Sequence, residues 1–388
     1  MGTVVRDMHD RIARRSFGAV GAAGAPVRVI HDAVAGVVHA SVREGIRTGA
    51  RVGAGLLAAG AGDDDPPLAC TPRGSLALGV LNGLCGNHLA ARGSVLAVEM
   101  GVRRDGRDVP VSAAGLAAGF PDAAARVAVF VHGLMEDDEC WRVLPLRRRT
   151  GGRPTYGERL QLELGFTPVH VRYNSGLRVS DNGRALAEML DGLVDGWPVS
   201  VEEIALVGHS MGGLLARSAC HYAQCGSRRW VARVRHVFCL GTPHLGADAE
   251  KGLNVLGHAL GVLPESRALA RVVNARSVGI KDLRYGSCVE EDWFDWDPDE
   301  FLRDRCTEVP FLPDAGYYFV GASLREGPLG ELIGDLLVRL PSASGRGHRR
   351  GRRIPFDAGN GYELSGVNHF ELLNHPAVYE QIQIWLSS

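Results

Sequence analysis

The chain has 388 residues, a length that fits one large domain with additional segments better than three domains. Its 43 basic and 44 acidic side chains leave a net charge of −1, which gives no global electrostatic reason to expect nucleic acid as a partner. Eight cysteines without a C-x-x-C pair indicate neither a disulfide framework nor a zinc site. We interpret them as buried free thiols, with a Cys288–Cys306 bridge as the alternative, and we expect no metal or cofactor.

Residues 1–73 are predicted to form a helical extension and a linker. Apolar residues recur at four-residue steps from Ile30 to Val42, as in an amphipathic helix. We interpret this helix as a layer over the core, and a membrane-surface or partner-binding helix is the alternative. The run of three aspartates and two prolines at 63–67 marks the linker. No secretory signal or membrane-spanning segment is evident, so we expect a cytoplasmic protein, peripheral to a membrane at most.

Residues 74–388 are predicted to form an α/β domain with a mostly parallel sheet. A hairpin signal at Asp105-Gly106 joins expected strands at 96–102 and 107–111. Short apolar runs separated by helical stretches indicate βαβ units with helices flanking the sheet. The expected buried strands lie at 127–131, 169–171, 204–207, 237–240 and 317–320, with helices at 183–193 and 213–223 between them.

An interval at about 246–316 separates the fourth and fifth of these buried strands. It is far longer than an ordinary connection in an α/β unit, and it contains an acidic, aromatic run from Glu290 to Trp296. We expect this insertion to form a cap or lid over the active site. A solvated structural excursion is the alternative.

A G-x-S-x-G pattern centred on Ser210 lies between a predicted buried strand and a predicted helix. This setting predicts a sharp turn that lifts the Ser210 hydroxyl above the sheet. Glycine is expected at Gly208 and Gly212 because a side chain there would collide with the neighbouring strand and helix. The backbone N–H of Met211 would lie at the helix N-terminus, where it can stabilise an oxyanion. Ser210 is therefore the candidate nucleophile.

A second oxyanion donor is expected from the loop after the strand at 127–131. There the sequence reads His132-Gly133-Leu134, and the glycine allows close approach of the backbone. The N–H of Leu134 would then point at the oxyanion. His132 precedes the nucleophile in the chain, so we expect it to order this loop by hydrogen bonding rather than to act as the base.

The general base must follow Ser210 in the chain, and a carboxylate must come between the two. We favour His369, which lies on a loop before the last amphipathic helix; His375 precedes a proline and is expected to cap that helix. Asp335 has the required chain order for the acid. Its rival is Asp282 in the insertion, for which an ion pair with a neighbouring basic residue is an adequate explanation. The other histidines after Ser210 are His221, His236, His244, His258 and His348.

Together these motifs resemble the lipase-like branch of the α/β hydrolases, including GPI inositol-deacylase-like and triacylglycerol-lipase-like proteins. The resemblance runs from about residue 126 to the C-terminus. It rests on V-H-G-L at 131–134, R-Y-N-S-G at 172–176, G-H-S-M-G-G at 208–213, G-T-P-H-L-G at 241–246 and G-D at 334–335. Asp335 stands in G-D-L-L-V rather than the commoner G-D-G-x-V.

The resemblance implies an α/β-hydrolase fold, an oxyanion donor at Leu134 and the nucleophile at Ser210. It also implies that the 241–246 loop borders an acyl pocket. The residues expected beside the substrate are His132, Gly133, His209, Thr242, Pro243 and His244.

We therefore predict a serine ester hydrolase that acts on lipid or other acyl esters through an acyl-enzyme on Ser210. Acyl transfer or amide hydrolysis with the same residues is the first alternative, because the acceptor depends on the cap and the pocket. A catalytically silent, membrane-associated scaffold is the second. Acyl chain length, head group and oligomeric state are left open by the sequence.

Overall fold

The computed structural model describes residues 71–142, 154–262, 273–324, 335, 337–347 and 352–387. The chain divides into two compact units, Met1–Leu68 and Ala69–Ser388. The predicted amphipathic helix and the linker at 63–67 lie outside the described residues. No helix in the described part of the chain is long and apolar enough to cross a membrane.

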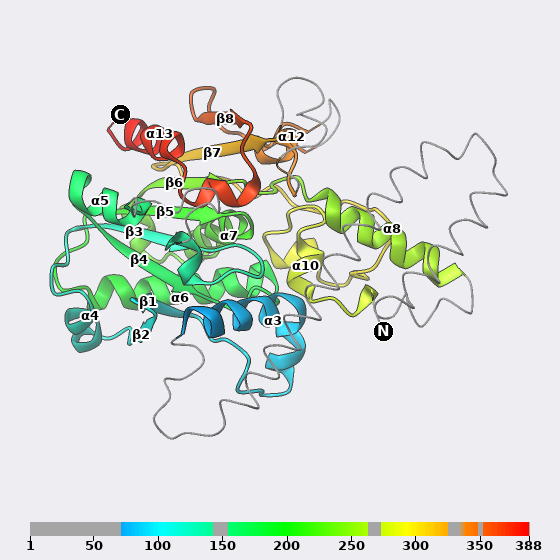
Figure 1. The fold of residues 1–388 in the computed structure, drawn as a ribbon, viewed down its shortest axis with the longest axis horizontal. Coiled ribbons are helices and arrows are strands. Elements are labelled where there is room, and N and C mark those ends of the chain that lie inside the picture. Colours follow the sequence, from blue (N-terminus) through cyan, green and yellow to red (C-terminus); the bar gives the residue numbers. More distant parts are fainter. Residues whose placement is uncertain are drawn as a thin grey trace. The chain divides into compact units, whose positions relative to one another are not determined.

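Within the described residues, an eight-stranded sheet forms the centre of the second unit (Figure 1). The strand order is β2-β1-β4-β3-β5-β6-β7-β8, and all neighbours from β4 to β8 run parallel. Only β1 runs antiparallel to both of its neighbours. The predicted hairpin is confirmed, but both strands are shorter and the first begins at Gly101 rather than at residue 96. The strands are β1 (Gly101–Arg104), β2 (Arg107–Val109), β3 (Arg126–Val131), β4 (Phe166–Arg172), β5 (Glu203–His209), β6 (Val234–Leu240), β7 (Gly316–Ser323) and β8 (Gly361–Ser365).

Helices cover both faces of the sheet, because side chains of the central strands alternate between two apolar clusters. In β3, Val127 and Val129 face one cluster while Phe130 faces the other. The first cluster contains residues of α4 (Ala113–Gly119), α6 (Val179–Gly196) and α7 (Met211–Cys225). The second contains residues of α5 (Tyr156–Leu164) and α13 (Pro376–Leu386). This is the α/β-hydrolase architecture expected from the sequence.

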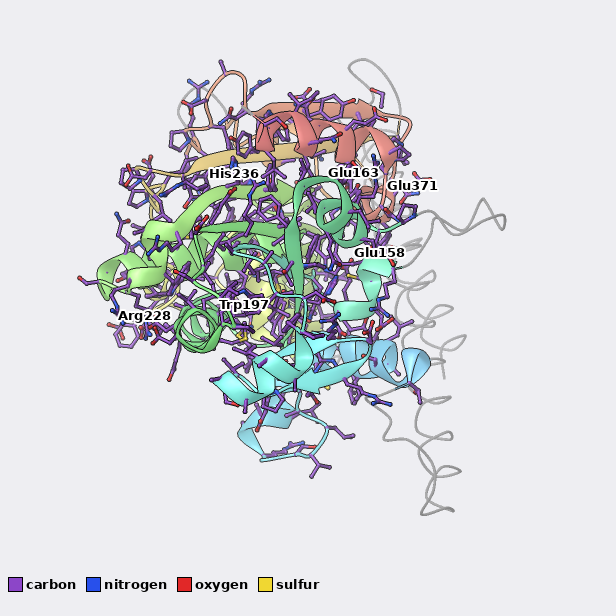
Figure 2. The ribbon with its side chains drawn as sticks, turned by 90° about the vertical axis from the view of Figure 1, so that its left-hand side faces the viewer. Glu158, Glu163, Trp197, Arg228, His236 and Glu371 are labelled. Carbon is purple, nitrogen blue, oxygen red and sulfur yellow. The ribbon has the colours of Figure 1, made fainter. Side chains whose placement is uncertain are left out.

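The C-terminal segment is fixed on the second face by contacts between α5 and α13. Figure 2 shows Glu163 where these two helices meet, and its carboxylate accepts a hydrogen bond from Tyr379 Oη (3.1 Å). Tyr156 Oη donates to the carbonyl of Leu372 (2.9 Å) and accepts from the N–H of His375 (2.7 Å). The short 3₁₀ helix η7 (His369–Leu373) is thereby held against the sheet.

The interval between β6 and β7 contains α8 (Asp248–Val262), which extends away from the sheet, α10 (Val278–Asp282) and η6 (Glu290–Asp292) (Figure 1). Its second half is anchored on α7, since Ser218 Oγ donates to the carbonyl of Cys288 (2.6 Å). Whether the insertion closes over the active site stays a prediction. Cys288 and Cys306 are free thiols, so the alternative of a bridge between them is wrong.

Several elements were not predicted, among them α4, α5 and the three that follow. The edge strand β8 has no apolar run, because alternate residues of Gly361–Ser365 face solvent. Helix α3 (Pro72–Ala91) begins at Thr71, whose side chain caps it by accepting from Gly74 N–H (3.1 Å). A short helix, α12 (Leu340–Ala343), follows the acidic residue Asp335.

Candidate active site

Ser210 lies at the sharp turn between β5 and α7 that the sequence predicts. Its φ of +52° is in the left-handed region, a conformation that costs a non-glycine residue about 1–3 kcal/mol. The neighbouring glycines make the turn sterically possible. A Cβ on Gly208 would lie 2.5 Å from the Gly212 carbonyl carbon, and one on Gly212 would overlap the carbonyl oxygen of Val131. The Ser210 N–H donates to Leu240 O (2.8 Å), which fixes the turn on β6.

The loop after β3 is organised by His132, which is fully buried. Its Nδ1 donates to the carbonyl of Gly133 (2.8 Å), and its Nε2 accepts the N–H of Tyr173 (3.3 Å). Burial lowers the pKa of His132, in keeping with this neutral tautomer. In a trans peptide the C=O and the next N–H point in opposite directions. By holding the Gly133 carbonyl, His132 therefore turns the N–H of Leu134 away from itself.

This loop approaches Ser210 closely. A Cβ on Gly133 would lie 2.9 Å from Ser210 Cβ, so only glycine fits between the loop and the serine. The backbone N–H groups of Leu134 and Met211 find no hydrogen-bond acceptor in the described part of the chain. Two unengaged donors beside a serine hydroxyl are the arrangement that an oxyanion hole requires.

Asp335 and His369 are brought together although 34 positions separate them. Asp335 Oδ2 lies 2.7 Å from His369 Nδ1, and both side chains are almost fully buried. The other carboxylate oxygen accepts the N–H groups of Leu337 (3.0 Å) and Val338 (2.8 Å), which fix the orientation of the acid. His369 Nε2 is buried and has no partner among the described residues.

The turn that holds His369 is itself capped. The side chain of Asn368 accepts the N–H groups of Phe370 and Glu371, and the Glu371 carboxylate accepts the Asn368 N–H (2.8 Å). Glu371 is labelled in Figure 2. This capping box fixes the first residue of η7, so the imidazole of His369 is held at its backbone as well as at Nδ1.

Asp282, the rival acid, has different partners. Its carboxylate binds Arg178 Nη1 (2.5 Å) and the N–H of Val179 (2.9 Å). Burial raises its pKa to about 6, against the opposing effect of Arg178. Asp282 thus attaches the insertion to the start of α6. The ion pair expected with a neighbour in sequence is formed instead with Arg178.

Glu136 is a functional candidate that sequence reasoning missed. Its Oε2 accepts the N–H of Gly133 (2.6 Å) and lies 3.0 Å from His209 Nδ1. Burial alone raises the pKa of Glu136, but the charge and hydrogen bond of His209 and the Gly133 N–H outweigh it and lower the pKa to about 2. Burial alone lowers the pKa of His209, and Glu136 outweighs it and raises that pKa. The signal in the sequence was the position of Glu136 three residues after Gly133, from which its carboxylate can reach back to the Gly133 N–H.

The loop at 241–246 packs against the start of α7. A Cβ on Gly213 would lie 2.9 Å from the Cβ of Thr242, and His244 Nδ1 accepts a hydrogen bond from Arg217 (3.1 Å). Thr242, Pro243 and His244 are all buried. Their predicted position at an acyl pocket stays a prediction, as do those of His132, Gly133 and His209.

Helix α3 also contributes to the site through its glycines. A Cβ on Gly79 would lie 2.6 Å from Glu136 O, and one on Gly83 would lie 2.9 Å from Met135 Cα. The helix therefore rests directly on the loop that carries Leu134. No motif in the sequence of this helix indicates such a role.

Sheet topology and the strand–Ser210–helix turn are those of the α/β-hydrolase fold. Residues 185–297 match the family described as PGAP1-like alpha/beta domain. This match covers less than a third of the chain and includes the turn at Ser210.

Several solved structures are similar to the chain. The mature lipase BlEst2 of Bacillus licheniformis is 18% identical over 68% of this chain and 93% of its own, with a TM-score of 0.43. Lipase 1 of Pelosinus fermentans is 12% identical over 68% of this chain and 99% of its own, with a TM-score of 0.38. An esterase of Pyrococcus furiosus is 12% identical over 68% and 81%, with a TM-score of 0.37. No curated protein matches the sequence.

Proposed function

We propose that the chain is a serine carboxylic ester hydrolase that forms an acyl-enzyme on Ser210. His369 Nε2 takes the proton of the Ser210 hydroxyl as the oxygen attacks the ester carbonyl. Asp335 keeps the His369 proton on Nδ1 and stabilises the imidazolium that forms. The N–H groups of Leu134 and Met211 stabilise the oxyanion. The alcohol leaves with the proton from His369, and water then releases the acid by the same steps in reverse order.

The observation that carries this proposal is the Asp335–His369 pair. A 2.7 Å contact to Nδ1 leaves Nε2 as the free basic nitrogen, and that nitrogen is buried without a partner among the described residues. The ring of His369 also lies against the turn of the nucleophile, with its centroid 4.7 Å from that of His209. This argues against the alternative of a silent scaffold, which would need no such pair.

Acyl esters, including those of lipids, are the proposed substrates. Phe370 and Leu337, which neighbour His369 and Asp335 in sequence, are large apolar side chains that remain exposed. Exposed apolar side chains next to a reaction centre favour an apolar acyl group over a charged one. We propose hydrolysis rather than acyl transfer because water serves as the acceptor and no second substrate is needed.

A fluorophosphonate probe tests the proposal, because it reacts with activated serine hydroxyls. We expect one label per chain in wild type and none in Ser210→Ala. Hydrolysis of p-nitrophenyl esters of increasing chain length, with added alcohol or amine acceptors, then separates hydrolysis from acyl transfer. Wild type that takes up no label, or Ser210→Ala that is labelled equally, would overturn the assignment.

A further inference from the structure

Glu136 and His209 form a second carboxylate–histidine pair directly behind the proposed catalytic residues. Both side chains are buried, and neither takes a direct part in the proposed chemistry. Glu136 belongs to the loop that carries Leu134, whereas His209 is the last residue of β5, next to Ser210. The pair therefore joins two of the segments that surround the nucleophile.

His209 reaches a third segment as well. Its Nε2 lies 3.1 Å from the carbonyl oxygen of His369, while its Nδ1 lies 3.0 Å from Glu136 Oε2. Both partners can only accept hydrogen bonds, so both ring nitrogens must donate. Only the imidazolium form of His209 carries both protons. A buried imidazolium needs a buried anion, and Glu136 supplies it.

Glu136 uses a single oxygen for two donors. Oε2 accepts the N–H of Gly133 at 2.6 Å and the N–H of His209 at 3.0 Å. The Gly133 N–H belongs to the His132–Gly133 peptide. The next peptide, Gly133–Leu134, carries the proposed oxyanion donor. The contacts thus run without a break from the oxyanion loop through Glu136 and His209 to the backbone of His369.

We propose that Glu136 and His209 are a positioning pair that holds the oxyanion loop and the His369 loop in fixed relation to Ser210. This inference rests on the proposed function, since it concerns how the residues of the same site are positioned. The pair touches no reacting atom, so its effect is on geometry. Misplacing catalytic groups by about 1 Å can slow a reaction by about 10²-fold.

The other titratable side chains around the pair keep a constant charge just above pH 7. Burial raises the pKa of Cys140 and of Tyr173 well above their usual values and lowers that of His132, so these neighbours of Glu136 stay neutral near pH 7. On the other side, His209 faces Asp335 and His369. Asp137, the next residue along the chain from Glu136, is also buried, and burial raises its pKa to about 6, so it is ionised at alkaline pH.

The pH dependence of the pair has a definite sign. The folded pKa of His209 is raised, so its stabilising effect is complete below about 6.5, the usual value, and is lost as pH rises through the folded pKa. The pKa of Glu136 is lowered to about 2, so its effect is complete above its usual value and is lost only in strong acid. We therefore expect kcat to decline at alkaline pH, where a histidine base alone would give a plateau.

Glu136→Gln separates this role from simple packing. If the amide oxygen of the new side chain accepts the Gly133 N–H, it also faces His209 Nδ1, which must then carry the proton. A neutral His209 has only one N–H, so its Nε2 could no longer donate to the His369 carbonyl. We expect kcat to fall about 10²-fold with KM within about threefold, and the alkaline decline to disappear because His209 is no longer charged. Glu139→Gln, the same exchange three residues further along, is the matched control and should keep the wild-type kcat and pH profile.

A second measurement works without the variant. Selective ¹⁵N labelling of histidine, with the His209 signals assigned by their loss in His209→Gln, reports the protonation of both ring nitrogens in wild type. We expect both to be protonated at pH 7. A neutral His209, or a folded Glu136→Gln enzyme with the wild-type kcat and alkaline decline, overturns the positioning pair alone. A wild-type enzyme that takes no label at Ser210 overturns the proposed function and the pair's role together.

Discussion

Replacing Asp335 by asparagine changes one atom of the proposed triad and leaves the loop around it intact. Oδ1 of the new side chain can still accept the N–H groups of Leu337 and Val338. The amide nitrogen would then face His369 Nδ1 at the position where the carboxylate oxygen now lies 2.7 Å away. Two donors cannot face each other, so His369 shifts its proton to Nε2 and can no longer accept the proton of Ser210.

We expect Asp335→Asn to lower kcat by about 10⁴-fold, equivalent to about 5 kcal/mol of transition-state stabilisation. The free energy of unfolding should change by only about 2 kcal/mol, because the two loop hydrogen bonds remain. Initial rates with a short p-nitrophenyl ester give kcat, and urea unfolding gives the stability.

Asp282→Asn is the matched control for this exchange. It breaks a buried ion pair with Arg178, so it should reduce stability by about 3–5 kcal/mol, while the enzyme that remains folded keeps its kcat. If Asp335→Asn stays within tenfold of wild type, or if folded Asp282→Asn loses as much activity, the reasoning about the acid is wrong.

Three further predictions concern the surroundings of the site. Gly212→Ala should abolish ester hydrolysis and lower the Tm by several degrees, because its Cβ overlaps the Val131 carbonyl; Gly359→Ala, with no atom within 4 Å, should change neither in the same assays. His369→Ala should lower kcat by about 10⁴-fold, whereas His221→Ala, on a half-buried position of α7, should leave kcat unchanged; equal losses would contradict the choice of base. His132→Phe should lower the free energy of unfolding by about 1–3 kcal/mol, because the Tyr173 N–H loses its acceptor. If urea unfolding gives this variant the same stability as wild type, His132 does not organise the loop after β3.

The central part of the fold was predictable because its signals are local. Parallel strands buried on both faces appear as continuous apolar runs, and β3, β5 and β6 have such runs. The turn at Ser210 was predictable for the same reason, since the steric requirement falls on Gly208 and Gly212 themselves. By contrast, β8 pairs with β7 on one side only and keeps half its residues exposed, so its composition carries little signal.

Several long-range contacts of the site could not be read from the sequence. The sequence favours Asp335 over Asp282 by its place in the chain, but the pairing itself depends on which carboxylate folding brings to His369. Glu136 lies in a polar stretch that looks like a solvated loop, and its contact with His209 forms only on folding. The role of α3 depends on glycines that matter because the Met135–Glu136 backbone packs on them.

The most direct test of the account is to trap the acyl-enzyme. Wild type is mixed with an activated ester, quenched in acid within one turnover, digested and analysed by mass spectrometry. We expect the acyl group on the peptide that contains Ser210, in an amount that decays at the steady-state rate of hydrolysis. Hydrolysis that proceeds without any acylated Ser210, or an acyl group that accumulates on another residue, would contradict the proposed mechanism.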